Sequence, residues 1–224
     1  MKSLVIDTTS STSYLILSDN GKKIEKKIEK SQNLSKNFHL ELKSFLENNN
    51  VSIDEITYLA CSVGPGSFSS LRVGASVAKT ISFLRKIPLV GYISLLAYVP
   101  DNDGKYIITM SAKSHGIYIL KVEKINGFIF YNEAELINIS RLERYKNYSI
   151  VSDDDNLILQ IMEKTSGFNF INQRFNSSSI THITNDLYEK KSYSNYNLNL
   201  LYLSGPNWQS EQDLEISKTV NEKF

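Results

Sequence analysis

A glycine-rich turn between a predicted strand and a predicted helix is the part of this chain best suited to chemistry. It opens the segment 64–74, which reads GPGSFSSLRVG. Two glycines around a proline give a tight turn, because glycine adopts positive φ without penalty. The free N–H groups of the following helix then form a seat for an anion next to the turn residues Gly64, Pro65, Gly66 and Ser67. Any α/β fold uses such a junction to change direction, so the geometry leaves the function open.

A polar turn after the first predicted strand could hold a metal-bound phosphate. It consists of Asp7, Thr8, Thr9 and Ser10, which offer a carboxylate and hydroxyls. Two-lobed phosphoryl-transfer enzymes normally use a pair of carboxylates that face each other across a cleft. A similar polar turn follows the first predicted strand of the second half of the chain, at 111–115. It carries no acid, which weakens a prediction of catalysis. Asp7 could equally cap its own turn.

The remaining side chains with chemical potential are scattered along the sequence. Arg72, inside the glycine-rich segment, could meet an anion or a partner carboxylate, or hold the turn through backbone carbonyls. Cys61 is the single cysteine and lies in an apolar run, which favours a small buried side chain over a nucleophile. The three histidines have no partner four residues away, so one helical face cannot supply two metal ligands.

Composition and charge indicate a soluble globular protein. The chain has 224 residues, of which 41% are hydrophobic and 22% charged, enough for one large domain or two lobes. A formal net charge of +1 argues against a protein that grips nucleic acid unaided. The N-terminal apolar run is far too short for a signal peptide or a membrane span. We therefore expect a cytoplasmic protein without membrane contact.

The predicted elements of the first half follow the order βββαβα. Apolar runs bounded by turn residues predict the strands, and apolar residues three and four apart predict a helix at 33–48. A long helix follows the glycine-rich turn and ends near Lys86, and a short helical piece is expected at 94–98. The strands are expected at 3–7, 13–18, 23–30, 57–63 and 88–92. The third strand, rich in lysine and glutamate, reads as a charge-guarded sheet edge.

A fainter second copy of the same order follows. Its strands are expected at 106–111, 116–122, 127–131 and 149–152, and its helices at 139–145 and 155–165. A duplicated unit of this kind resembles the plan of actin-like, Hsp70-like (ASKHA) ATPases. We therefore predict an α/β fold with two lobes, at 1–100 and 105–208. The charged stretch at 209–224 is predicted to be a loose helix or a disordered tail.

Three stretches of the first lobe resemble the TsaB family, also called YeaZ, which is the bacterial dimerisation subunit of the tRNA threonylcarbamoyladenosine machinery. They read VIDTTSSTSYLIL, GPGSFSSLRVGASVAKTISF and IPLVGYISL, and SAKSHGIY at 111–118 is similar to a further family stretch. The chain departs from the family pattern at Asn33, Ser69, Ser70 and Ser111. The family usually has histidine, threonine, glycine and aspartate at these four positions.

The resemblance implies a non-catalytic subunit. Members of this family pair with TsaD, which transfers a threonylcarbamoyl group to the adenosine next to the anticodon of tRNA. The resemblance further implies that this chain alone binds no cofactor, that ATP and a metal ion belong to partner subunits, and that a TsaE ATPase is a third subunit. Contact with tRNA is expected mainly through the complex. A homodimer is also expected, because apolar helices are rarely left bare in water.

The family pairs with TsaD through the first helix and the long helix. The resemblance carries this role onto Ser70, Gly74, Val77, Ala78 and Ile81 in the long helix, of which Ser70, Gly74 and Ala78 form a stripe of small residues, and onto Leu34, Phe38, Leu42 and Phe45 in the first helix. On this basis Gly74→Arg or Ala78→Arg should leave the fold intact and abolish pairing. From the residues alone, both helices could instead simply cover the chain's own sheet.

Two enzymatic alternatives stand beside the scaffold hypothesis. An active small-molecule kinase or ATPase of the actin-like fold would show turnover by the isolated chain and a second carboxylate in the cleft. A glycoprotease-like metallohydrolase would show a constellation of metal ligands or a nucleophile. The sequence shows neither constellation, so the scaffold hypothesis leads.

Overall fold

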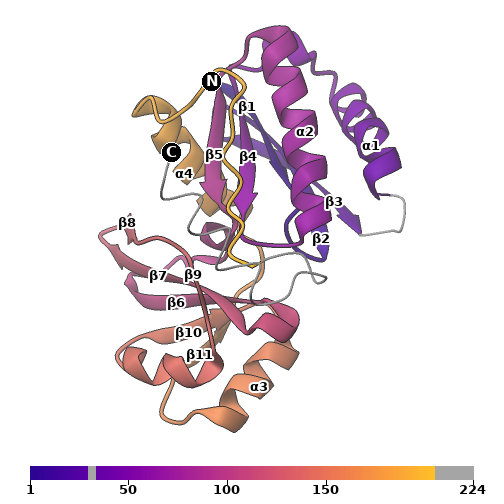
Figure 1. Cartoon of the computed structure of the whole chain (residues 1–224). Coiled ribbons are helices and arrows are strands. Elements are labelled where there is room, and N and C mark those ends of the chain that lie inside the picture. Colours follow the sequence, from indigo (N-terminus) through magenta and orange to yellow (C-terminus); the bar gives the residue numbers. More distant parts are fainter. Residues whose placement is uncertain (30–33, 205–224) are drawn as a thin grey trace, which may run out of the picture.

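Two β-sheets, one above the other in Figure 1, form the frame of the molecule. The computed structural model describes residues 1–29 and 34–204. Asn33 and the predicted tail at 209–224 lie outside these residues.

The first sheet has the strand order β3-β2-β1-β4-β5. β1 pairs antiparallel with β2 and parallel with β4, and β4 pairs parallel with β5. The central strands are nearly continuous apolar runs, because both faces of this sheet are covered. The exposed lysines and glutamates of β3 confirm its predicted place at the edge. The strands are β1 (Lys2–Asp7), β2 (Thr12–Asp19), β3 (Lys22–Glu29), β4 (Tyr58–Gly64) and β5 (Leu89–Ile93).

Helices α1 (Leu34–Asn48) and α2 (Phe68–Arg85) lie side by side over one face of this sheet (Figure 1). α2 begins directly after the glycine-rich turn and ends at Lys86, whose left-handed conformation stops the helix. The buried 3-10 helix η2 (Ser94–Tyr98) follows β5. The predicted order of elements in the first lobe is therefore confirmed.

The second sheet has the order β11-β10-β6-β7-β8, and β9 also pairs with β7. The predicted helix at 139–145 is a 3-10 helix, η4 (Ile139–Tyr145), and β9 and β11 were not predicted because each has three residues. Helix α3 (Asp155–Lys164) agrees with the prediction. The strands are β6 (Gly104–Ser111), β7 (Ile117–Ile125), β8 (Phe128–Tyr131), β9 (Glu135–Ile137), β10 (Ser149–Ser152) and β11 (Phe170–Asn172).

After β11 the chain returns to the first lobe. In helix α4 (Ser177–Glu189), Asn185 accepts a hydrogen bond from the Tyr58 hydroxyl at 2.6 Å, and the Tyr188 ring stacks on the Tyr58 ring with centroids 4.6 Å apart. Further on, the Leu201 N–H donates to the Val63 carbonyl at 2.8 Å. The last described part of the predicted second lobe, 105–208, therefore packs on strands of the first lobe, and residues 205–208 lie outside the described residues.

One hydrophobic core joins the two lobes. It contains Val5 and Ile16 of the first sheet together with Ile108 and Leu120 of the second, all fully buried. An aromatic stack strengthens the junction, where the Phe175 ring lies parallel to the Tyr14 ring at 3.8 Å. The lobes therefore share a packed interface on one side and diverge on the other.

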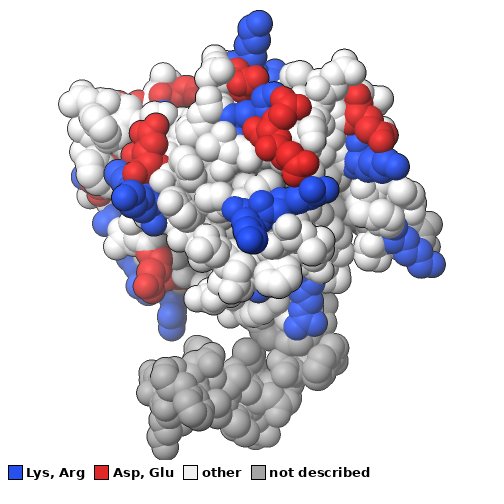
Figure 2. All heavy atoms as spheres, turned by 90° about the horizontal axis from the view of Figure 1, so that it is seen from above, with Lys and Arg blue, Asp and Glu red and all other residues white. Residues whose placement is uncertain are grey.

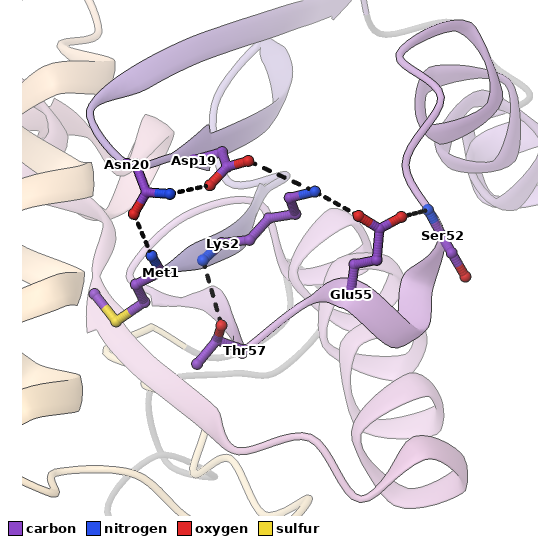
Figure 3. A network of polar contacts seen from close by, with 7 residues as sticks. All are labelled: Met1, Lys2, Asp19, Asn20, Ser52, Glu55 and Thr57. Carbon is purple, nitrogen blue, oxygen red and sulfur yellow. Dashed lines mark hydrogen bonds and ion pairs between the residues drawn. The ribbon is translucent and has the colours of Figure 1, made fainter.

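A polar network fixes the far end of β1 (Figure 3). The N-terminal amino group donates to Asn20 at 2.6 Å, and the Lys2 ammonium lies 2.6 Å from Glu55 and 3.6 Å from Asp19. These contacts tie the β2–β3 turn and the 3-10 helix η1 (Ile53–Glu55) to the start of β1. On this side of the molecule, basic and acidic side chains lie interspersed (Figure 2).

Candidate functional site

A cleft of about 950 Å³ opens between the two lobes. It brings together the turn after β1 and the second-lobe turn, as the sequence predicted, and adds the glycine-rich turn to them. It also receives two segments that were not predicted there, the β10–α3 loop and the returning chain at 201–204. Its lining residues include Thr9, Ser10, Gly66, Ser67, Phe68, Ser111, Lys113, His115, Asp153, Asp154, Asp155, Tyr202 and Ser204.

The glycine-rich turn packs directly against the turn after β1. The Ser67 N–H donates to the Thr9 carbonyl at 3.1 Å, and a Cβ atom on Gly66 would lie 2.7 Å from that same oxygen. Only glycine fits there, because real Cβ atoms do not come so close to a carbonyl oxygen. The Gly64–Pro65 peptide bond is cis. Because Ser67 is hydrogen-bonded to Thr9, the two turns form one continuous wall of the cleft.

Asp7 is sealed beneath this wall rather than exposed in the cleft. Its carboxylate accepts hydrogen bonds from the Thr9 N–H at 2.9 Å, the Thr9 hydroxyl at 2.6 Å and the Tyr92 hydroxyl at 2.8 Å. Burial raises the pKa of Asp7, and the hydrogen bonds from Thr9 and Tyr92 oppose that rise. The structure thus shows the alternative in which Asp7 caps its own turn. The side chain does not face a bound phosphate in this arrangement.

Thr8 and Ser10, which lie close to Asp7 in the same turn, make hydrogen bonds to different parts of the chain. The Thr8 hydroxyl donates to the Ser70 carbonyl at 2.7 Å, which fastens the turn to the first turn of α2. The Ser10 hydroxyl donates to the Thr12 carbonyl at 2.8 Å and lies in the cleft wall. Of the four turn residues named from sequence, Thr9 and Ser10 line the cleft, while Asp7 and Thr8 support it.

Arg72 lies at the rim of the cleft. Its guanidinium covers the Phe68 ring at 4.0 Å, and its Nε donates to the Tyr202 hydroxyl at 3.3 Å. Both aromatic rings line the cleft. In the structure Arg72 joins the start of α2 to the returning chain through aromatic side chains, and not through the backbone carbonyls that the sequence suggested.

Three carboxylates from the second lobe reach the cleft, and the sequence reasoning missed them. Asp153, Asp154 and Asp155 follow β10 directly. Burial raises the pKa of Asp153. Asp154 caps α3, accepting from the N–H groups of Asn156 and Leu157 at 3.0 and 3.2 Å. The sequence analysis compared only the two lobe turns and found no second cleft carboxylate. The loop after β10 supplies these acids, because the carboxyl ends of parallel strands β6 and β10 meet at the same edge.

The predicted interface residues of α1 point inward. Phe38, Leu42 and Phe45 are only 1%, 5% and 3% exposed and belong to the core that the helices form with the first sheet. The side chain of Leu34 lies outside the described part of the chain. These three residues cannot meet a partner in this conformation, which corrects the prediction for α1.

The stripe of small residues on α2 also faces inward. Ser70 and Ala78 are buried, and a Cβ on Gly74 would lie 2.5 Å from the Thr8 hydroxyl oxygen. The stripe lets α2 approach its own sheet rather than a second helix. This corrects the prediction for Ser70, Gly74 and Ala78. It also overturns the expectation that Gly74→Arg or Ala78→Arg leaves the fold intact.

A second apolar stripe of α2 lies at the margin of the core, against which Val73, Val77 and Ile81 still pack. Val73, Val77 and Ile81 are half-buried, and Leu84 is 68% exposed. These four residues, spaced four, four and three apart, form what we call the outer α2 face. Val77 and Ile81 of the predicted set therefore do reach the surface.

Two further observations concern the part of the chain that the structure describes. Within residues 1–29 and 34–204, no three histidine, cysteine, aspartate or glutamate side chains lie close enough together to hold a metal ion. Among the same residues, no helix has the length and apolar character needed to cross a membrane. Cys61 is buried, and this burial raises the pKa of its thiol far above the ordinary value.

Sequence relatives point to one family. The model of the family described as TsaD, tRNA N6-adenosine threonylcarbamoyltransferase, matches residues 27–185. The tRNA threonylcarbamoyladenosine biosynthesis protein TsaB of Buchnera aphidicola subsp. Acyrthosiphon pisum is 30% identical over 129 residues, which cover 52% of this chain and 58% of that protein. The tRNA N6-adenosine threonylcarbamoyltransferase of Fervidobacterium nodosum is 40% identical over 86 residues, which cover 35% of this chain and 25% of that protein. The chain thus spans little more than half of the first relative.

Solved structures share the fold at low identity. YeaZ from Pseudomonas aeruginosa has a TM-score of 0.76 at 12% identity, over 90% of this chain and 99% of that chain. A second Pseudomonas aeruginosa protein, described as similar to peptidase YEAZ, has a TM-score of 0.77 at 12% identity, over 91% and 99%. This likeness confirms the predicted two-lobed α/β fold. The family match shows that the chain belongs to the TsaD family, and within it the chain is similar to TsaB proteins and shares the fold of YeaZ.

Proposed function

We propose that this protein is a non-catalytic subunit in the biosynthesis of threonylcarbamoyladenosine in tRNA, and that it pairs with a TsaD-type subunit. The names of its relatives support a place in this biosynthesis. The catalytic work, with ATP and a metal ion, belongs to the partner subunits in this proposal, and tRNA is contacted mainly in the complex.

The outer α2 face carries the proposal. α2 already buries one stripe against its own sheet, yet Val73, Val77, Ile81 and Leu84 continue an apolar surface along its other side. A helix that is apolar on two sides is normally covered on both. A second helix lying along these residues would remove their remaining exposed surface from water. Full burial of a side chain of this size contributes about 1.5–3 kcal/mol, of which the half-buried residues would add only a part.

The state of the cleft supports a non-catalytic role. Asp7 is enclosed by Thr9 and Tyr92, and the carboxylate of Asp154 accepts a hydrogen bond from the N-terminus of α3. A phosphoryl-transfer enzyme would need both acids free to face substrate and metal.

One observation keeps an enzymatic alternative in view. Asp153 lines the cleft, and burial raises its pKa, which is a frequent property of catalytic carboxyl groups. If the chain were an active kinase or ATPase, the isolated protein would hydrolyse or transfer phosphate, and Asp153→Asn would abolish that activity.

The decisive experiment mixes the purified chain with the TsaD-type protein of the same organism. Size-exclusion chromatography with light scattering measures the complex, and threonylcarbamoyl transfer to tRNA is assayed for each fraction. We expect a mixed complex that is active only when both chains are present. Addition of a TsaE-type ATPase to the same column tests the third subunit.

Two matched variants locate the interface. Leu84→Arg places a charge on the outer α2 face and should abolish pairing and any competing homodimer. Leu159→Arg makes the same change at an exposed leucine of α3, in the other lobe, and should pair normally. Transfer by this chain alone, or absence of a complex with wild-type protein, would overturn the proposal.

A further inference from the structure

The β7–β8 hairpin exposes aromatic side chains on the second lobe. Phe128 and Phe130 are 70% and 60% exposed, and β8 lies at the outer edge of the second sheet (Figure 1). Apolar side chains of this size are rarely gathered on a surface without a binding role. The other exposed edge strand described above, β3, instead carries lysines and glutamates.

The strand register places these rings beside basic groups. Phe130 is paired across the sheet with Glu123, and Glu123 in turn with Lys105. Directly paired residues of antiparallel strands lie on the same face of the sheet, and Phe128, two positions along, shares that face. Lys121 lies there as well, because it precedes Glu123 by two residues.

Tyr145 and Tyr148 extend the aromatic row beyond the hairpin. The Tyr148 hydroxyl donates to Glu123 at 2.6 Å, and its ring lies 5.4 Å from the Lys121 ammonium and 5.9 Å from that of Lys105. The Tyr145 ring stands edge-on to Tyr148 at 6.2 Å, with the Arg144 guanidinium 5.9 Å above it. We call Phe128, Phe130, Tyr148 and Tyr145, with Lys105, Lys121 and Arg144, the aromatic strip.

The charge of the strip is positive. Glu123 is its acid, and the hydrogen bond from Tyr148 holds the pKa of that carboxyl below its usual range, so it is ionised at neutral pH. Lys105 and Lys121 both lie 3.9 Å from this single carboxylate, and Arg144 adds a third cation. Three cations against one anion suit a polyanion better than an acidic or neutral peptide.

The hairpin holds its rings on a fixed frame. The N–H groups of Asn126 and Gly127, at its tip, donate to the two carboxylate oxygens of Asp103, the second of them at 3.0 Å. Phe128 and Phe130 are two residues apart on one strand, so their rings stand about 7 Å apart. Rings held in this way can each receive one base without losing much freedom.

We propose that the aromatic strip binds a single-stranded segment of RNA. Bases would stack on Phe128 and Phe130, and Lys105, Lys121 and Arg144 would face the phosphates. Exposed aromatic rings interleaved with cations are the usual means of binding single strands without sequence preference. The inference rests on the proposed function, in which tRNA is the substrate, and it assigns to this chain a tRNA contact of its own.

Fluorescence anisotropy with a short labelled oligouridylate tests the proposal on the full chain at low salt. We expect weak, salt-dependent binding. The double variant Phe128→Ser with Phe130→Ser should weaken it about tenfold or more, because each stacked base contributes strongly. Removing two phosphate contacts in Lys105→Ala with Lys121→Ala should flatten the logarithmic salt dependence by about 1.4.

Control variants separate this surface from general effects. Lys22→Ala with Lys27→Ala removes the same charge from the exposed edge strand β3 and should leave RNA binding unchanged. Leu84→Arg should lose the TsaD-type partner but keep RNA binding, and the double phenylalanine variant should keep the partner. The two proposals therefore fail independently.

Three results would overturn the assignment. Wild-type protein that does not bind the oligouridylate has no such site. Equal binding by the double phenylalanine variant and wild type would place the RNA elsewhere. A wild-type dimer that the same variant converts to a monomer would show that a second copy of the chain covers the strip.

Discussion

The contact between Gly74 and Thr8 predicts a large loss of stability from a very small substitution. A Cβ atom on Gly74 would lie 2.5 Å from the Thr8 hydroxyl oxygen and 3.2 Å from the Thr8 methyl carbon. That hydroxyl is already engaged, because it donates to the Ser70 carbonyl. Gly74→Ala should therefore push Thr8 out of its hydrogen bond or push α2 away from the sheet.

The magnitude follows from three terms. Overpacking costs about 1–3 kcal/mol, an unsatisfied buried polar group costs about 1–3 kcal/mol, and the better helix propensity of alanine offsets about 1 kcal/mol. The free energy of unfolding should thus fall by about 1–5 kcal/mol, according to these same terms. Urea denaturation followed by circular dichroism measures it.

A double-mutant cycle makes the prediction specific. Thr8→Ala removes both of the nearest atoms, so Gly74→Ala should cost less in that background, with a coupling of about 1 kcal/mol or more. Ser76→Ala, at an exposed position of the same helix, serves as the control and should be neutral or slightly stabilising. A Gly74→Ala protein as stable as wild type, with purely additive behaviour toward Thr8→Ala, would refute the close approach of α2 to this turn.

Two further predictions concern the ends of the fold. The hydrogen bond from Lys2 holds the pKa of Glu55 below its ordinary value of 4.5. The contribution of this pair to the free energy of unfolding is therefore present above pH 4.5 and is lost as the pH falls through the lower pKa that Glu55 has in the folded protein. The difference in unfolding free energy between wild type and Glu55→Gln should therefore shrink on acidification below pH 4.5, and a constant difference would contradict the role of this pair. Tyr58→Phe removes the hydrogen bond to Asn185 and should lower the free energy of unfolding by about 1 kcal/mol, with faster amide hydrogen exchange in α4. Unchanged exchange there would show that the aromatic stacking alone holds α4.

Much of the first lobe could be predicted because its local signals are strong. Long apolar runs such as that of β1, and the Asp19-Asn20-Gly21 turn after β2, leave little choice of structure. The meeting of the turn after β1 with the second-lobe turn followed from the duplicated order of elements.

Helix α4 and the acids of the cleft could not be found in the same way. α4 begins with three serines and carries several β-branched residues, so its helical preference is weak, and it forms because Ile180 and Ile183 bury against the joined core. Asp153 lies in a run of three aspartates that reads as a loop. Only the pairing of β10 beside β6 directs it into the cleft.

The sequence by itself determined the family, the strand–turn–helix junction at the glycine-rich segment and the apolar character of α2 on more than one side. The tertiary structure decided which side of α2 packs on the chain's own sheet and which side stays near the surface. Periodicity reports that a stripe exists, but the surface that covers it depends on contacts between residues far apart in the chain. Ser70 and Gly74 are small because the turn after β1 lies against them, and Ala78 is fully buried in the core of the first lobe. The outer α2 face stays only partly covered, with Leu84 exposed, because the stripe of small residues takes the place against the chain's own sheet.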